Sequence, residues 1–187
     1  CVNSAPYDGD ALSDWRFEHL TTTDSMFKGS NIISVGVASW DVRTIQTAAH
    51  MFQDAKNFNE DLSEWDVAAL SSAASMFQDA SNFEQDLSKW NVVKLTIAQH
   101  MFDSASSFNS TLDGWNVGKL SDARSMFKDA ITFEGNLSSW SVDKLMRVEH
   151  MFDGAQQFNS DLSLWSLSPT STASFKAMFK NAKQFNS

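Results

Sequence analysis

Apolar residues recur along this chain with a period of 25 residues. The pattern is clearest for tryptophan, at Trp15, Trp40, Trp65, Trp90, Trp115, Trp140 and Trp165. Met-Phe pairs and a second phenylalanine keep the same period through most of the chain, as at Met76-Phe77 and Phe83. A fixed period of this length is typical of proteins in which each repeat packs mainly on its neighbours.

The first part of each repeat predicts a short strand. Trp65 and Val67 are two residues apart, which places both side chains on one side of an extended chain and Asp66 on the other. Together with Leu62 and Leu70, they match the leucine-rich-repeat template, with Trp in one leucine position. We therefore expect parallel strands stacked ~4.8 Å apart.

The second part of each repeat predicts a helix of about three turns. Leu70, Ala73, Phe77 and Ala80 have the spacing of one helix face, and Ser71 is suited to cap its start. The expected fold is an α/β repeat solenoid of the leucine-rich-repeat type, with one short parallel strand and one helix per repeat. About seven repeats would form a single domain over residues 1–187, with like side chains stacked as ladders in a continuous core.

Composition and motifs argue against several functions. The net charge is −9 and the lysines and arginines are scattered, which argues against nucleic acid as a partner. No apolar run is long enough to cross a membrane as a helix. The sequence contains no motif of a nucleophilic enzyme, a zinc protease or a phosphate-binding loop. We therefore expect neither catalysis nor a cofactor.

The histidines do not predict a metal site. His50, His100 and His150 lie two repeats apart, hence at least ~10 Å from one another on strand spacing. Zinc instead needs ligands that converge at ~2.0–2.1 Å, so we expect each histidine to bond a neighbouring backbone. Asp61 and its equivalents supply one carboxylate per repeat, too few for calcium. We expect them to hydrogen-bond the adjacent turn.

A second period, of 50 residues or two repeats, is superimposed on the 25-residue period. The residue before Met alternates between Ser and His, as at Ser75 and His100. The residue after the second Phe alternates between Asn and Glu, as at Asn59 and Glu84. Two separate positions with the same longer period indicate growth by duplication of a two-repeat unit.

Two polar columns flank the tryptophans and form the candidate partner-binding face. They alternate with apolar strand positions, so they should point to the exposed side of the sheet. The candidates are Asp41, Glu64, Asp66, Lys89, Asn91, Asn116, Ser141 and Ser166. The column after Trp changes from acidic to neutral along the chain, which favours a basic or amide-rich ligand at its N-terminal end. A solvated polar face without a ligand is the alternative.

Three further features concern modification and assembly. Asn109 and Asn136 stand in N-x-S/T sequons, which carry glycans only in a eukaryotic secretory pathway. Cys1 is the single cysteine; it is an incidental thiol, a bond to another chain or absent segment, or a lipid-modified N-terminus. The C-terminal repeat has no obvious cap, so we expect a contact with a partner or further chain at that end.

The repeat M-F-x-x-A-x-x-F-N-x-D-L-S-x-W-D-V-x-x-L closely resembles the BspA-like leucine-rich repeats. Residues 48–67 come near that consensus, and the resemblance covers essentially the whole chain. It implies a leucine-rich-repeat fold. Because the better-studied members resemble surface adhesins, it also implies binding to host matrix proteins or other cells. It brings no catalytic residues.

Two functions follow from these observations. The first is a secreted or cell-surface adhesion or recognition protein that binds other proteins through the strand face. The alternative is a structural or scaffold subunit of a larger stable assembly, including one in an organelle lumen. Exposed apolar residues such as Ile97, Ile131 and Leu164 would favour the scaffold if they gather on one face.

The tryptophan ladder generates a prediction about stability. Trp90→Ala should lower the free energy of unfolding by ~3–5 kcal/mol, because it leaves a cavity between neighbouring repeats. Trp15→Ala should cost less, because a terminal repeat supports only one interface. Urea unfolding measures both variants, and equal losses at the two positions would contradict a stacked core.

Overall fold

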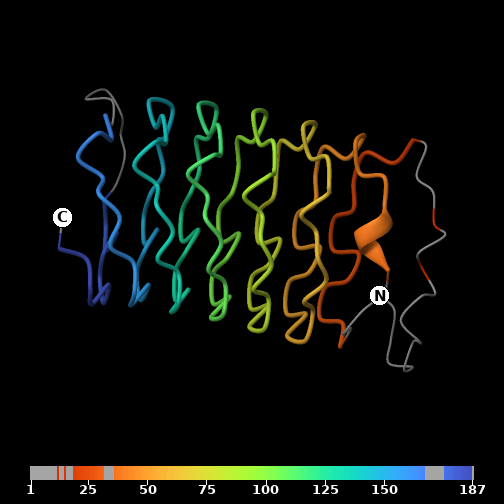
Figure 1. The fold of residues 1–187 in the computed structure, drawn as a ribbon, viewed down its shortest axis with the longest axis horizontal. Coiled ribbons are helices and arrows are strands. Elements are labelled where there is room, and N and C mark those ends of the chain that lie inside the picture. The colour runs from red at the N-terminus through yellow and green to blue at the C-terminus, as the bar shows by residue number, and fades with distance from the viewer. Residues whose placement is uncertain (1–11, 13–14, 16–18, 32–35, 167–174, 187) are drawn as a thin grey trace.

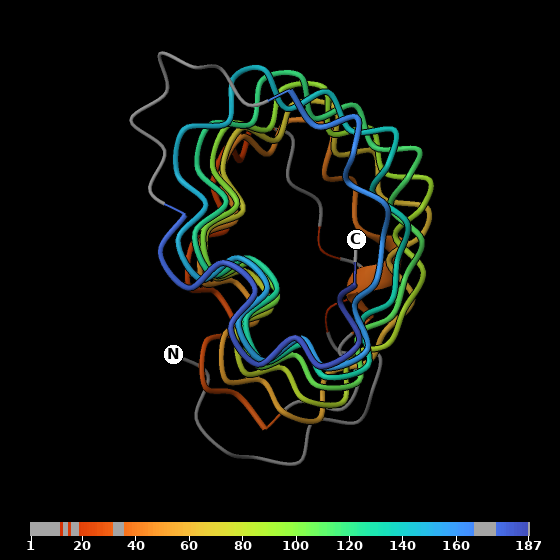
Figure 2. The same cartoon turned by 90° about the vertical axis from the view of Figure 1, so that its left-hand side faces the viewer.

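A computed structural model describes residues 12, 15, 19–31, 36–166 and 175–186. In this part of the chain each repeat forms one coil, and the coils stack side by side along a single axis (Figure 1). Seen along the stack, successive coils follow one another around a shared interior (Figure 2). Parallel bridges join equivalent residues of neighbouring coils: Thr22–Thr47, Thr47–Ser72, Ser72–Ile97, Ile97–Asp122 and Asp122–Arg147.

The α/β fold predicted from the sequence is wrong. The helix found among the described residues is η1, a 3-10 helix of 3 residues at Val37–Ser39. Strands in the same part of the chain are reduced to isolated bridges. The molecule is therefore not a leucine-rich-repeat solenoid with a strand and a helix in each repeat. It is a stack of coils built from turns.

Left-handed backbone prevents the predicted helix. His50 has φ 58° and Asp54 has φ 59°, whereas a right-handed helix requires φ near −63°. Equivalent positions in other repeats share this conformation: Ser25, Gly29, Ser75, Asp79, His100, Ser104, Ser125, Asp129, His150, Gly154, Ala177 and Asn181. Two left-handed residues in each repeat turn the segment into a succession of tight turns.

Backbone amides in this segment alternate between two kinds of partner. The His50 amide donates to the Ala74 carbonyl of the next coil at 2.8 Å. The following amide, of Met51, donates to the Ala48 carbonyl of its own coil at 3.3 Å. The Phe52 amide again donates to the next coil, at 2.9 Å. Alternate amides thus join the coils, and the amides between them close turns.

The apolar spacing that predicted a helix arises from these turns. Ala73, Phe77 and Ala80 are buried because each turn directs one side chain inward, and a turn advances the chain by about as many residues as a helical turn does.

The sequence carries a signal that distinguishes this succession of turns from a helix. The second left-handed position holds Gly, Asp, Asn or Ser in each described repeat, and Gly, Asp and Asn are the types that best tolerate this conformation.

The segment predicted as a strand also consists of turns. The Trp65 amide donates to the Leu62 carbonyl at 3.1 Å, and the Leu70 amide donates to the Val67 carbonyl at 2.9 Å. An extended strand instead directs its amides sideways to its neighbours. The four apolar side chains are nevertheless buried, so the pattern identified the core residues correctly and the backbone conformation wrongly.

Aromatic ladders fill the interior, as the sequence predicts. Trp90 lies between Trp65 and Trp115, with ring centroids 6.3 and 6.2 Å away. Phe77 and Phe102 stack at 5.7 Å with their ring planes 1° apart. Such offset stacking adds roughly 0.5–1.5 kcal/mol per pair beyond the burial of apolar area.

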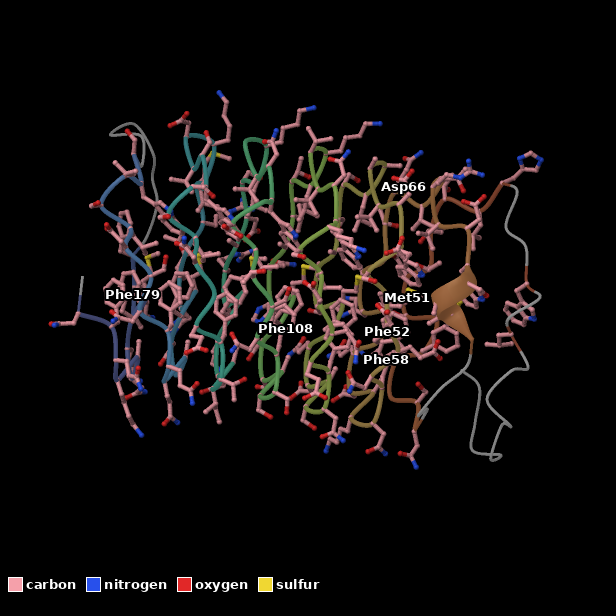
Figure 3. All side chains as sticks on the ribbon, viewed as in Figure 1. Met51, Phe52, Phe58, Asp66, Phe108 and Phe179 are labelled. Carbon is pink, nitrogen blue, oxygen red and sulfur yellow. The ribbon has the colours of Figure 1, made fainter. Side chains whose placement is uncertain are left out.

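Two further contacts bind the ladders together. Phe52 and Phe58 of one coil stack at 3.9 Å in the interior (Figure 3). The Trp90 indole N–H donates to the Leu62 carbonyl, 28 residues earlier, at 2.9 Å. Equivalent bonds are made by Trp40, Trp65, Trp115, Trp140 and Trp165. Trp90 is 2% exposed and Trp15 is 45% exposed, which supports the unequal losses expected at these positions.

The left-handed turns can be tested at Ser125, a buried residue with φ 53°. In a helix, Ala would be more stable than Gly by about 1 kcal/mol. In the left-handed conformation, Ser125→Gly should instead be more stable than Ser125→Ala by ~1–2 kcal/mol, because only Gly avoids the clash of Cβ with the backbone. Chemical denaturation of the two variants gives the order.

The matched control is Ser121, four residues earlier, whose φ is not positive. At that position Gly should be less stable than Ala, because it loses more backbone entropy on folding. The same order at both positions would contradict the turn geometry.

Candidate functional site

The predicted partner-binding residues lie on one exposed edge of the stack. We call this edge the rim: it is the loop from the residue before each Trp to the fourth residue after it, as in residues 64–69. Figure 3 shows Asp66 on this outer edge, away from the interior Phe52 and Phe58. The exposed candidates are Asp41, Glu64, Asp66, Lys89, Asn91, Asn116, Ser141 and Ser166. They form rows along turns, and not the face of a sheet.

The residues directly after each Trp use their side chains to stabilise the turns in which they lie. A side-chain oxygen of Asp66 accepts the Ala68 amide at 3.1 Å, and one of Asn116 accepts the Gly118 amide at 3.2 Å. Asn91 makes the same contact at 3.3 Å. One side-chain acceptor is therefore used locally in these residues, while the rest of the side chain faces solvent.

Ion pairs offset the acidic charge at the N-terminal end of the rim. Hydrogen bonds from Arg43 lower the pKa of Asp41 to about 2, and the two charged groups are 2.6 Å apart. Lys89 pairs with Glu64 of the preceding coil at 2.6 Å, and this contact raises the pKa of Lys89. The rim there presents paired charges of both signs.

The rim carries a second charged column, which was not among the predicted partner-binding residues. Lys94, Lys119 and Lys144 follow their tryptophans by four residues, and all three are exposed. Their 25-residue spacing is visible in the sequence. The strand prediction did not include this lysine column, because the predicted binding columns consisted only of the residues directly before and after each Trp.

The carboxylates that precede Leu-Ser serve the turns, as predicted. Asp61 accepts the Ser63 amide at 2.9 Å, and Asp86 accepts the Ser88 amide at 2.8 Å. The hydrogen bond from the Ser63 backbone amide is the main cause that lowers the pKa of Asp61. Asp161 and Asn136 make equivalent contacts.

The histidines bond side chains, so the predicted backbone contact is wrong. His100 Nδ1 lies 2.8 Å from the Asp103 carboxylate, and His150 Nδ1 lies 2.9 Å from that of Asp153. Both carboxylates are largely buried. In His50 the partner is the neutral side chain of Gln53, at 2.7 Å. Each histidine thus bonds a side chain three residues along in its own coil.

Asp122 is a buried carboxylate that takes part in two of the bridges between coils and pairs with two arginines. It is 3% exposed and bonds Arg124 at 2.7 Å and Arg147 of the next coil at 3.2 Å. Burial by itself would raise the pKa of this carboxyl, but hydrogen bonds from Arg124, together with Arg147, outweigh it and lower the pKa. Asp122 thus joins two coils electrostatically.

Both sequon asparagines are exposed but hydrogen-bonded. Asn109 donates to the Glu134 side chain at 3.2 Å and accepts the Glu134 amide at 3.1 Å. Asn136 accepts the Ser138 amide at 3.0 Å and the Ser160 hydroxyl at 3.2 Å. The Asn-Glu pair gives a physical reason for the alternation of Asn and Glu along this row, because the neighbouring coils Asn59–Glu84 and Asn109–Glu134 carry complementary partners. Glycosylation at either asparagine stays a prediction.

An apolar hollow of about 320 Å³ lies among the last described residues. Its apolar lining comes from Leu162, Trp165, Phe175, Met178, Phe179 and Phe185. The exposed Ile97, Ile131 and Leu164 are not part of one row, because they lie 7, 16 and 24 residues after the preceding Trp. They therefore form no single apolar row along the stack, and the scaffold alternative stays a prediction.

The prediction for Cys1 concerns a residue outside the part of the chain that the structure describes. Within the described part, no helix combines the length and apolar character needed to span a bilayer.

Comparison with known sequences identifies one family. The sequence model described as "Mycoplasma protein of unknown function, DUF285" matches residues 3–115 and 87–187. The two matches overlap over 87–115, as expected when a repeated sequence aligns in more than one register. The match supports a repeat family and leaves the BspA-like assignment as a resemblance. No curated protein matches the chain.

The Asp122 cluster generates a prediction about acid stability. A carboxyl whose folded-state pKa lies below its ordinary value of 3.8 stabilises the fold above that value. This contribution is lost as the pH falls through the lowered pKa. Arg124→Gln should raise the folded-state pKa, so that acid unfolding begins at higher pH in a titration followed by circular dichroism.

Arg43→Gln is the control, because it removes an ion pair in which both partners are exposed. Arg43 also lowers the pKa of Asp41, but solvent screens an exposed pair, so the acid midpoint of this variant should move less than that of Arg124→Gln. Equal shifts for the two variants would refute the role assigned to Asp122.

Proposed function

The chain belongs to the family of Mycoplasma proteins of unknown function, DUF285, and we propose that it is a non-catalytic recognition module of a secreted or cell-surface protein. Its partners are other proteins, bound at the rim. This proposal concerns the exposed edge of the coils, since the sheet face first expected to bind is not formed.

One observation carries the proposal: the interior is constant from coil to coil, while the rim varies. Tryptophan recurs in all seven repeats at the same position. The next residue changes along the stack, as Asp41, Asp66, Asn91, Asn116, Ser141 and Ser166. A uniform scaffold that displays different polar groups at regular intervals is suited to recognition along an extended surface.

The rim is also held in place before any partner arrives. The Trp65 amide closes the turn that leads into the rim, and the Leu70 amide closes the turn that leaves it. Asp66 stabilises the turn between them. A surface held in this way loses little conformational entropy on binding, which favours affinity.

The non-catalytic part of the proposal is supported by the position of the histidines. His100 and His150 occupy the same position of the repeat and make the same contact with a buried carboxylate. A histidine–carboxylate pair that recurs at the same position of the repeat is explained by a structural role within each coil, and so it gives no reason to propose catalysis.

The alternative function is a structural subunit of a larger stable assembly. The apolar hollow beside Trp165 and Phe179 favours it, because contiguous exposed apolar surface marks contact sites. Under this alternative, the protein purified from its source would be found in a complex of fixed stoichiometry by native mass spectrometry.

Binding to immobilised extracellular-matrix proteins and to intact cells tests the proposal. The protein should bind one of these probes saturably. The variant Asp41→Asn/Glu64→Gln/Asp66→Asn should bind it roughly tenfold more weakly, because each lost charged contact at an interface edge typically costs a fraction of a kcal/mol to about 1 kcal/mol. Surface plasmon resonance and cell-binding assays give the affinities.

The matched control is Asp54→Asn/Asp79→Asn/Asp129→Asn, which removes the same number of acids away from the rim. All three positions have left-handed backbone, which Asn tolerates, so the control should fold and bind as the unmodified protein does. No saturable binding, or equal losses in the two variants, would count against recognition at the rim.

A further inference from the structure

Backbone amides of the last described coil lack the partners that their equivalents have in earlier coils. Alternate amides of each turn segment donate to the next coil, as Phe152 does to the Met178 carbonyl at 2.8 Å and Gly154 does to that of Lys180 at 2.7 Å. Within the described part of the chain, no carbonyl accepts the equivalent amides one coil later, which belong to Ala177, Phe179 and Asn181. The last coil therefore presents three donors at alternate residues along one edge.

Carbonyls of the first described coil form the complementary set. In later coils the equivalent carbonyls accept amides from the preceding coil, as Met51 does from Phe27 at 2.9 Å and Gln53 does from Gly29 at 2.7 Å. No amide among the described residues donates to the corresponding carbonyls of the first described coil, those of Asp24, Met26 and Lys28. One end of the stack thus has three acceptors with the spacing of the three donors at the other end.

The tryptophan ladder is less covered at both ends than in its middle. Trp140 is 3% exposed, whereas Trp165 is only partly buried and Trp15 is 45% exposed. Phe179, in the last described coil, is also only partly buried, and it lines the apolar hollow together with Trp165. Contiguous exposed apolar surface of this kind marks a contact site.

The two ends also differ in charge. Residues 175–187 carry three lysines and no acidic residue, whereas residues 1–31 carry five acidic and two basic residues. Opposite charges steer two surfaces toward each other, and like charges suppress contact between surfaces of the same sign. Backbone hydrogen bonding and charge therefore make each end complementary to the other end and not to itself.

We propose that a second copy of this chain stacks head to tail on the last described coil. The carbonyls of Asp24, Met26 and Lys28 in the second copy accept the three amides of that coil, and its Trp15 packs on Trp165. The 25-residue register of the stack thereby continues across the contact. This inference goes beyond recognition of partners at the rim, because it concerns the ends of the stack and a copy of the same chain.

The direction of the contact follows from the chemistry of the ends. Two C-terminal ends related by a two-fold axis would set amide donors against amide donors and lysines against lysines. A head-to-tail contact instead leaves one donor end and one acceptor end unused, so further copies can add in the same direction. Phe27 is 3% exposed, so Trp15 is the aromatic side chain through which the acceptor end adds apolar contact.

One row of side chains predicts a favourable pair across the contact. Residues 25 apart in this row contact each other within the stack, since Arg124 donates to the Gln99 side chain at 2.6 Å. Among the described residues the row begins with Asp24 and ends with Lys176, both of which are exposed. Continued into a second copy, the row places these opposite charges side by side.

A neighbouring row predicts an unfavourable pair. In this row Lys128 lies 3.5 Å from the Asp103 carboxylate of the preceding coil. Among the described residues the row begins with Lys28 and ends with Lys180, both of which are exposed. The proposed register therefore sets two like charges beside each other, which weakens the contact. A change of charge at Lys28 should then strengthen the association, which makes the register itself testable.

Sedimentation velocity at increasing protein concentration tests the proposal. The weight-average mass of the unmodified chain should rise beyond that of two chains. Asp24→Lys and Lys176→Glu should each lower the association constant about fivefold, because each places like charges together. An equimolar mixture of the two variants should restore the association, since opposite charges can then meet again. A chain that stays monomeric overturns the proposal, as does a mass that stops at two chains and is unaffected by Asp24→Lys.

Lys28→Glu should instead raise the association constant about fivefold, because it replaces a like-charge pair with an ion pair. The matched control is Lys119→Glu, at an exposed lysine in the middle of the stack. Both variants change the net charge equally, and added negative charge by itself would weaken association. Equal effects of the two variants would refute the register. Urea unfolding checks that every variant folds, and rim binding is measured with other variants, so the two proposals can fail separately.

Discussion

The alternation of backbone hydrogen bonds between the coils is the interaction on which the rest of this structure depends. One amide of the turn segment donates to the next coil, and the following amide closes a turn in its own coil, as at His50 and Met51. A continuous strand would send its amides only to its neighbours, and a helix would send them only to itself. This combination of hydrogen bonds within and between coils requires two left-handed residues per repeat, and it sets the register in which neighbouring coils stack.

Register then determines the interior. Because bridged residues are 25 apart, each Phe and Trp lies beside its own equivalent in the next coil, and flat rings can stack in long series. Where the repeat varies, the neighbouring coil supplies the compensating contact. The Ser110 hydroxyl accepts the Leu87 amide, and the Ser160 hydroxyl accepts the Leu137 amide, each at 2.9 Å. Glu60 accepts the amides of Gly36 and Ala38 at the corresponding place.

Freedom at the rim follows from this constraint. Rim side chains contribute one acceptor to a local turn and otherwise face solvent, so their chemistry can change without disturbing the ladders. The paired charges near Asp41 and Glu64 and the unpaired column from Lys94 to Lys144 lie on the same edge. Two regions of one scaffold thus differ in electrostatic character while they share the same backbone.

The sequence by itself determined the period, the core residues and the exposed columns, because burial repeats with each coil and leaves a direct trace in the positions of Trp, Phe and Leu. It also predicted the turn contacts of Asp61 and Asp86, which depend on residues two positions away. Apolar spacing did not distinguish a helix from successive turns, since both bring a side chain inward at similar intervals. Backbone conformation at positions such as Asp79 depends on hydrogen bonds to another coil. The tertiary structure decided this conformation, and its trace in the sequence is confined to the Gly, Asp, Asn and Ser residues of the second left-handed position. The 25-residue spacing of Lys94, Lys119 and Lys144 is present in the sequence, but the structure is what places these lysines together on one exposed edge.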